Sequence, residues 1–81
     1  MMPGLKRSPV QVGEVVQVAD KDYCYGTGIL ILRVTEVGPI QQQRDGSWIS
    51  LYGLELRPDG SQKSSQPRHA LVRVSGLRTR P

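Results

Sequence analysis

Glycine and proline recur along this chain, and they leave room only for short segments of regular structure. The sequence has nine glycines and six prolines among 81 residues, and hydrophobic residues make up 37% of it without a single phenylalanine. Because glycine and proline mark turns and interrupt helices, their frequency along the chain argues against a helical bundle and favours short strands. The length allows one modest core of Val, Leu and Ile, so we expect one domain and no separate domain for a cofactor.

Alternation of hydrophobic and polar residues predicts five strands, because a half-buried strand has a side-chain period of two. They are residues 14–19, 29–37, 40–43, 47–57 and 70–74. Gly38-Pro39 is expected to separate the second strand from the third. Asp45-Gly46, between alternating segments, predicts a tight hairpin.

The fourth predicted strand changes parity along its length. Ile49 and Leu51 share one face of a regular strand, whereas Leu54 and Leu56 share the other. A bulge near Gly53 would bring all four onto the core face, so we expect the strand to bend there.

These strands predict an all-β fold, a small, strongly bent antiparallel barrel of the SH3 type with five strands. The domain is expected over residues 10–77, preceded by a flexible arm at 1–9 and followed by a frayed basic tail at 78–81, with a short helical turn at 75–77. The nearest alternative is a five-stranded oligonucleotide-binding barrel. It needs a helix before its last strand, and residues 58–69 have too few apolar side chains for one.

Charge is unevenly distributed. Eleven Lys and Arg against seven Asp and Glu leave a net charge of +4. Residues 1–40 hold four bases and four acids, whereas residues 41–81 hold seven bases and three acids, none of them after Asp59. This asymmetry fits a polyanionic partner, and it equally fits a basic tail that only maintains solubility.

Arginine outnumbers lysine by eight to three, and its planar guanidinium matches phosphate oxygens in bidentate fashion. We therefore predict a non-enzymatic module that binds double-stranded DNA through backbone phosphates, with about five contacts and low sequence specificity. The predicted DNA-binding residues are Arg33, Arg44, Lys63, Arg68, Arg73, Arg78 and Arg80.

A second hypothesis is a protein- or peptide-interaction module. Its contact surface would be either a barrel edge or the aromatic residues Tyr23, Tyr25 and Trp48. If Ile49 and Leu51 face the core, Trp48 faces outward and could stack on a partner or help to form a cage for a cation. The alternative is that Trp48 packs under the long loop of residues 19–28 against a tyrosine.

Catalysis and metal binding find little support in the sequence. The chain has one histidine, His69, and one cysteine, Cys24, so a nucleophile with an activating base or a zinc site is not expected. We predict no cofactor and no enzymatic activity. A lone cysteine and the lack of a long apolar segment predict a cytoplasmic protein without membrane contact, associated with the nucleoid if it binds DNA.

Three segments together resemble a bromo-adjacent homology (BAH) domain, a β-rich chromatin-associated module with an SH3-like core. Residues 12–18 are similar to its Gly-acid-x-Val opening strand, residues 31–37 to its second strand, and residues 45–51 with 56–59 to its Asp-Gly, Trp and Arg-Pro-acid stretch. The resemblance implies a binding module. The chain is shorter than typical members of that family and lacks their later insertions, and from its arginine-rich composition we expect a free-standing bacterial module.

Overall fold

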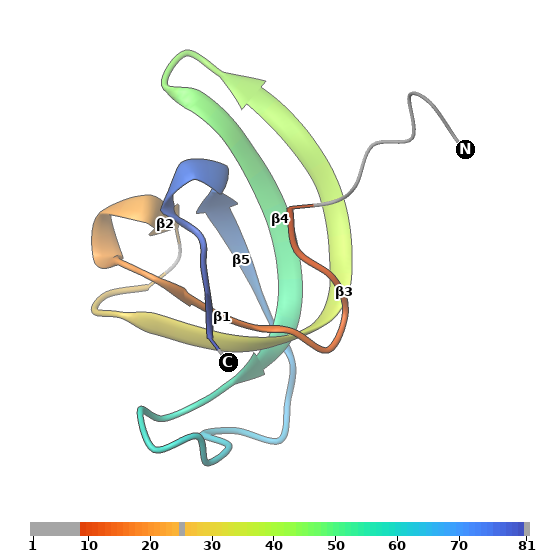
Figure 1. The fold of residues 1–81 in the computed structure, drawn as a ribbon, viewed down its shortest axis with the longest axis vertical. Helices are drawn as coiled ribbons and strands as arrows, with labels where there is room; N and C mark the ends of the chain where they lie inside the picture. Colours follow the sequence, from red (N-terminus) through yellow and green to blue (C-terminus); the bar gives the residue numbers. More distant parts are fainter. Residues whose placement is uncertain (1–8, 25, 81) are drawn as a thin grey trace.

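The computed structural model describes residues 9–24 and 26–80 as one curled antiparallel sheet (Figure 1). Six strands have the spatial order β2-β5-β4-β3-β1-β6. The elements in chain order are β1 (Val15–Val18), the 3-10 helix η1 (Asp20–Asp22), β2 (Tyr23–Cys24), β3 (Leu30–Gln43), β4 (Gly46–Glu55), β5 (Arg68–Arg73), the 3-10 helix η2 (Val74–Gly76) and β6 (Arg78–Arg80). The described residues include no α-helix, so the all-β prediction is confirmed, although the number of strands is six and not five.

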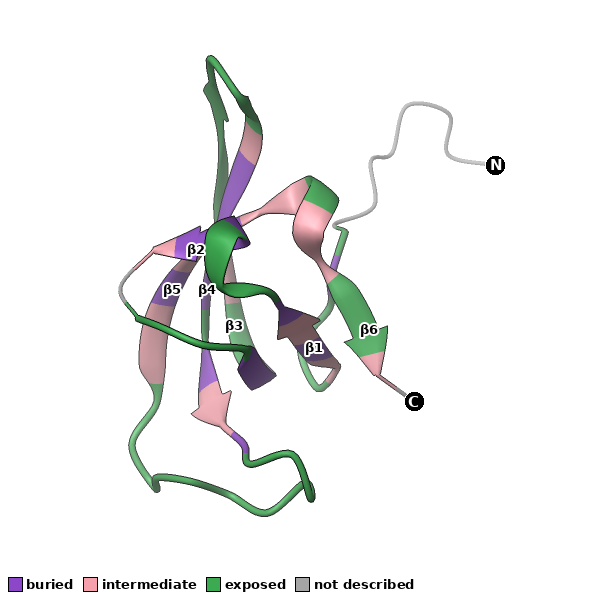
Figure 2. Cartoon of the chain, turned by 90° about the vertical axis from the view of Figure 1, so that its left-hand side faces the viewer, coloured by how far each residue is buried: buried purple, intermediate pink, exposed green. Residues whose placement is uncertain are grey.

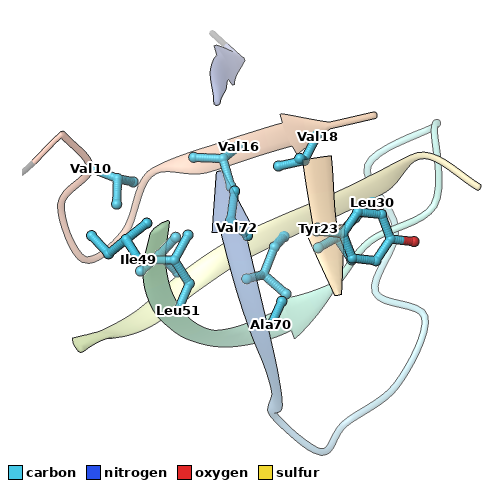
Figure 3. Close-up of a cluster of buried hydrophobic side chains, with 11 residues drawn as sticks. Val10, Val16, Val18, Tyr23, Leu30, Ile49, Leu51, Ala70 and Val72 are labelled. Atoms are coloured by element: carbon cyan, nitrogen blue, oxygen red, sulfur yellow. The ribbon is translucent and has the colours of Figure 1, made fainter. Parts of the chain in front are cut away.

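The core lies on the concave face of the sheet, where alternate residues of the strands point inward (Figure 3). In β1, Val16 and Val18 are buried while Val15 and Gln17 are only half-buried. Strands β3, β4 and β5 complete this interior with aliphatic side chains. The buried cluster consists of Val10, Val16, Val18, Tyr23, Leu30, Leu32, Val34, Ile49, Leu51, Ala70 and Val72.

Strand β3 passes through Gly38-Pro39 without a break, which corrects the prediction of two separate strands. The pairing shifts between Val37, opposite Leu51, and Ile40, opposite Ile49. Two residues of β3 therefore oppose the single residue Ser50 of β4. Proline is tolerated at such a bulge, because the ladder is already interrupted there and its missing N–H leaves no hydrogen bond unmade.

The predicted bulge in β4 near Gly53 is also wrong, because the irregularities lie in β3. Besides the shift at Gly38-Pro39, a second shift falls between Val34 and Glu36. Gly53 instead marks a close approach of two backbones: a Cβ at this position would collide with the carbonyl oxygen of Arg33. Leu54 is accordingly half-buried and not part of the core, while Leu56 is buried.

The hairpin predicted at Asp45-Gly46 is confirmed. Gln43 pairs with Gly46, so Arg44 and Asp45 form a two-residue connection, and Gly46 has the positive φ of 122° that glycine accepts without strain. Figure 1 shows the β3–β4 hairpin as a long curved arm whose tip extends beyond the neighbouring strands.

The end of the chain is ordered where the sequence predicted a frayed tail. Arg78–Arg80 forms β6, which pairs with β1 from Gln17 to Val15. The short helical turn before it is confirmed as η2. The domain therefore extends past residue 77, because β1 offers its free edge to the chain that follows η2. Of the arm predicted at 1–9, only Pro9 is among the described residues.

Candidate nucleic-acid interface

The pairing register brings three arginines onto the outer face of the sheet. Val15 of β1 lies opposite Arg33 of β3 on one side and opposite Arg80 of β6 on the other. Gln17, two residues along and therefore on the same face, lies opposite Arg78. Because paired residues point to the same side of a sheet, Arg33, Arg78 and Arg80 share the face turned away from the core. Figure 2 shows that most of β6 is exposed.

This outer face is hollowed into a trough of three adjoining pockets of about 290, 260 and 270 Å³. Arg80 lines both the first and the second pocket, and Gln17 and Ile29 line both the second and the third. We call this continuous surface the cationic trough. Its lining is Val15, Gln17, Ala19, Lys21, Asp22, Ile29, Ile31, Arg33, Glu55, Leu56, Arg57, Pro58, Asp59, Gly60, Lys63, Gly76, Arg78 and Arg80.

A tight turn after β4 forms one wall of the cationic trough. Leu56 bridges to Gln62, and the Arg57 backbone N–H donates to the carbonyl oxygen of Ser61 at 2.8 Å. The Arg57 guanidinium also donates to the carbonyl oxygen of Gln62 at 2.9 Å. The turn therefore holds Arg57 beside the trough, and Arg80 extends to it from β6 with a long contact of 3.5 Å to the carbonyl oxygen of Pro58.

Cations outnumber carboxylates in this lining by six to three. Lys63 pairs with Glu55 at 3.3 Å and Lys21 with Asp22 at 3.0 Å. Within residues 9–24 and 26–80, the remaining four cations form no ion pair, and they are all arginines: Arg33, Arg57, Arg78 and Arg80.

Local contacts lower the pKa of two trough carboxylates, Glu55 and Asp59. Burial by itself would raise the pKa of Glu55, but hydrogen bonds and charge from Arg68 and Lys63 outweigh it, so that the pKa is lowered. The pKa of Asp59 is lowered chiefly by hydrogen bonds from the hydroxyl and backbone N–H of Ser61. These two anions moderate the positive potential without cancelling it.

The structure gathers four of the seven predicted DNA-binding residues in the cationic trough: Arg33, Lys63, Arg78 and Arg80. Arg68 lies next to it and is paired with Glu55 at 3.2 Å. Arg44 is exposed at the hairpin connection and is not part of the trough lining; it lies next to Asp45, which pairs with Arg73. The seven predicted residues therefore do not form one group, because strand parity and ion pairing divide them.

Arg73 is neutralised in a second cluster, which shares Asp22 with the trough lining. Its guanidinium lies 3.2 Å from a carboxylate oxygen of Asp22 and 3.0 Å from one of Asp45, and 4.6 Å from the ring centroid of Trp48. The Trp48 indole N–H donates to Asp45 at 2.9 Å, and this hydrogen bond, with those from Arg73, lowers the pKa of Asp45. With its side chain only 24% exposed, Arg73 joins β5 to the hairpin and to η1, and its guanidinium is engaged by both carboxylates.

The proposed aromatic surface is contradicted by the register. Tyr23 pairs with Val72, which faces the core, whereas Trp48 pairs with Arg73 on the opposite face. Tyr23 is 7% and Trp48 8% exposed. The Tyr23 hydroxyl donates to the carbonyl oxygens of Thr27 and Gly28 under the loop, and burial raises its pKa. Trp48 thus packs beneath Arg73 and not against Tyr23; Tyr25 lies outside the described residues.

His69 and Cys24 are placed as parts of the sheet. His69 pairs with Tyr52, and their rings stack with centroids 4.8 Å apart. Cys24 pairs with Leu71 at the β2 edge and is half-buried.

Among the described residues, no group of three or more His, Cys, Asp or Glu could hold a metal ion. In the same part of the chain, no helix has the length and hydrophobicity to span a bilayer.

Sequence reasoning missed Arg57 and Lys21, together with the uncharged lining residues Gln17 and Ile29. Arg57 had one local signal, its place between the end of a strand and the Pro58-Asp59-Gly60 turn. Lys21 sits among acids in the sequence and carried no such signal.

Comparison with known proteins yields no match to a protein-family model, a curated protein or a solved structure.

Proposed function

We propose that this protein is a non-enzymatic DNA-binding module that holds the phosphate backbone along the cationic trough. The observation that carries the proposal is the register that sets Arg33 and Arg80 on either side of Val15 and adds Arg78 two residues away. Arg57 joins them from the turn after β4.

The geometry suits a line of phosphates. Arg78 and Arg80 are two residues apart on one strand, hence about 6.6 Å, and Arg33 is two strands away from Arg80, hence about 9.6 Å. Four guanidiniums that are not engaged with carboxylates can each donate to phosphate oxygens as a planar fork. Contacts of this kind position a nucleic acid without reading its sequence, so we propose low sequence specificity.

A salt titration tests the proposal. With about four phosphates neutralised, the logarithm of the affinity for a duplex should fall with the logarithm of salt concentration with a slope near −3.6, roughly a hundredfold loss between about 50 and 200 mM. Fluorescence anisotropy with a labelled duplex measures this slope. A slope near zero, or no binding at the lowest salt, rejects the proposal.

A matched pair of variants localises the contact. Arg33→Ala with Arg80→Ala should remove about two phosphate contacts and make the slope shallower by about 1.8. Arg44→Ala removes an exposed arginine from the hairpin connection, outside the trough, so the slope should stay at the wild-type value. Equal effects of the two changes would place the DNA elsewhere.

At the level of the family, we propose that the curled sheet is an SH3-like barrel extended by a sixth strand, and that the chain is a small bacterial relative of BAH domains acting in the cytoplasm at the nucleoid. The antiparallel curled sheet and the β3–β4 hairpin support this assignment. Localisation of a fluorescent fusion at the nucleoid, lost in the Arg33→Ala, Arg80→Ala variant, would support it. A diffuse signal for the wild type would count against it.

A further inference from the structure

The central pocket of the cationic trough has an apolar floor, unlike a surface that only contacts phosphate. Ile29, Ile31, Leu56 and Pro58 line it, and its volume is about 260 Å³. Ile31 and Leu56 are 5% and 6% exposed, so they form a fixed base, whereas Ile29 is 63% exposed and stands at the side. Phosphate gains nothing from such a floor, because an apolar surface offers it no hydrogen-bond donor.

Polar groups surround this floor. Arg80 and Arg57 provide guanidiniums, Gln17 provides an amide that both donates and accepts, and Glu55 provides a carboxylate whose oxygens are engaged by Lys63 and Arg68. The pocket is below the size range of sites that hold drug-sized ligands. It therefore suits one flat group with an apolar face and a polar edge, attached to an anion held at the rim.

We infer that this pocket receives one unpaired nucleobase of a strand whose phosphates lie on Arg80 and its neighbours. The inference rests on the proposed function and extends it to the choice of ligand. The face of the base would lie on Ile29, Ile31 and Leu56, and its edge would meet Gln17. A base within an intact duplex has both faces stacked on its neighbours and cannot enter without being extruded. A single strand offers its bases without that cost.

The consequence is a preference for unpaired strands. At equal length and salt, a single strand should bind more tightly than a duplex, even though the duplex carries the greater charge density. Because the floor is aliphatic and lacks an aromatic platform, the gain from one base is modest, about five- to tenfold, and tolerant of base identity.

Anisotropy titrations with two single strands of equal length test the inference. One strand has ordinary bases, and the other is abasic throughout, so that both carry the same phosphates. We expect the abasic strand to bind about five- to tenfold more weakly, with the same salt slope. Equal affinities overturn the base pocket and leave the phosphate proposal standing. Absence of binding by either strand, with the duplex still bound, also overturns the base pocket, whereas absence of binding by the duplex as well rejects the phosphate proposal itself.

Two variants assign the effect to the pocket. Ile29→Ala should reduce the difference between the two strands to less than about twofold, because it removes the exposed side of the floor. Ile40→Ala, which trims an isoleucine that is 48% exposed on the β3–β4 arm, should leave the difference intact. An unchanged difference in Ile29→Ala contradicts the inference. A second result would also contradict the inference: an acidic peptide of the same charge that competes for the pocket as well as the base-containing strand does. That result would identify a peptide as the occupant.

Discussion

The guanidinium of Arg73 lies 4.6 Å from the ring centroid of Trp48, and this contact separates a structural arginine from the four that line the cationic trough without an ion pair. The same guanidinium bridges Asp22, whose side chain is 8% exposed, and Asp45 at the hairpin connection. Its interactions thus connect β5, η1 and the hairpin, and they leave little of its hydrogen-bonding capacity for a ligand.

Arg73→Ala should therefore lower stability and spare DNA binding. Loss of the ion pair to the buried Asp22 and of the contact with Trp48 should cost about 2 kcal/mol in the free energy of unfolding. Urea unfolding measures this cost, with Arg44→Ala as the matched control that should cost less than about 0.5 kcal/mol. Affinity for the duplex should stay within about twofold of wild type. A tenfold loss of affinity in a stable Arg73→Ala variant would show that Arg73 contacts the DNA.

Glu55→Gln should increase the affinity for nucleic acid. Glu55 pairs with Lys63 and Arg68, so the substitution removes one negative charge from the central pocket and the ion pair from both cations. The affinity should rise roughly two- to fivefold at low salt, and the rise should diminish as salt screens it. Anisotropy at two salt concentrations measures both effects. A lower affinity in Glu55→Gln would show that Glu55 itself contacts the ligand or orders the wall.

Acid should destabilise the fold through Asp45 and Glu55. The pKa of each is lowered in the folded state from ordinary values of 3.8 and 4.5, so their stabilising effect is complete above those values and is lost as the pH falls through the lower, folded-state pKa. Urea unfolding at a series of pH values should show constant stability near neutrality and a decline below about pH 4.5. Asp45→Asn should make that decline shallower, whereas an identical decline would exclude Asp45 as a contributor.

Gly53→Ala should be among the most damaging single changes to the sheet. A Cβ at Gly53 would collide with the backbone of Arg33 and lie 2.9 Å from Cγ of Leu32, so β3 and β4 would have to separate. We expect a loss of more than about 3 kcal/mol. Gly28→Ala is the control, because a Cβ there meets nothing within 4 Å and only the positive φ of 77° opposes it, at about 1–2 kcal/mol. Equal losses, measured by thermal unfolding, would contradict the close approach.

Removing residues 78–81 should destabilise the domain as well as weaken binding. β6 covers the outer edge of β1, and Val16, which pairs with Thr79, belongs to the core. The truncated chain should lose about 1–3 kcal/mol of stability and expose the β1 amides, which hydrogen exchange would detect. Unchanged exchange in β1 would mean that the end of the chain is frayed, as the sequence alone predicted.

The sequence predicted the fold class and the central hairpin because those depend on local chemistry. Alternation in residues 15–18 and the Asp45-Gly46 turn have the same meaning in almost any context, and both predictions are confirmed. The path of β3 through Gly38-Pro39 could not be predicted in this way. Whether proline ends a strand depends on whether a partner needs its N–H, and that is a property of the assembled sheet.

In the candidate site, too, local sequence predicted some features and the assembled sheet decided the others. The sequence by itself determined that this chain is basic in its second half, rich in arginine and built of short strands, because composition and local periodicity do not depend on how the strands are arranged. Only the tertiary structure decided which arginines act together. Pairing with β1 brings Arg33 and Arg80 to one face although they are 47 positions apart in the chain, while Asp22 and Asp45 fold back to neutralise Arg73. Long-range register and ion pairing select partners by spatial distance, and spatial distance is set by the complete fold.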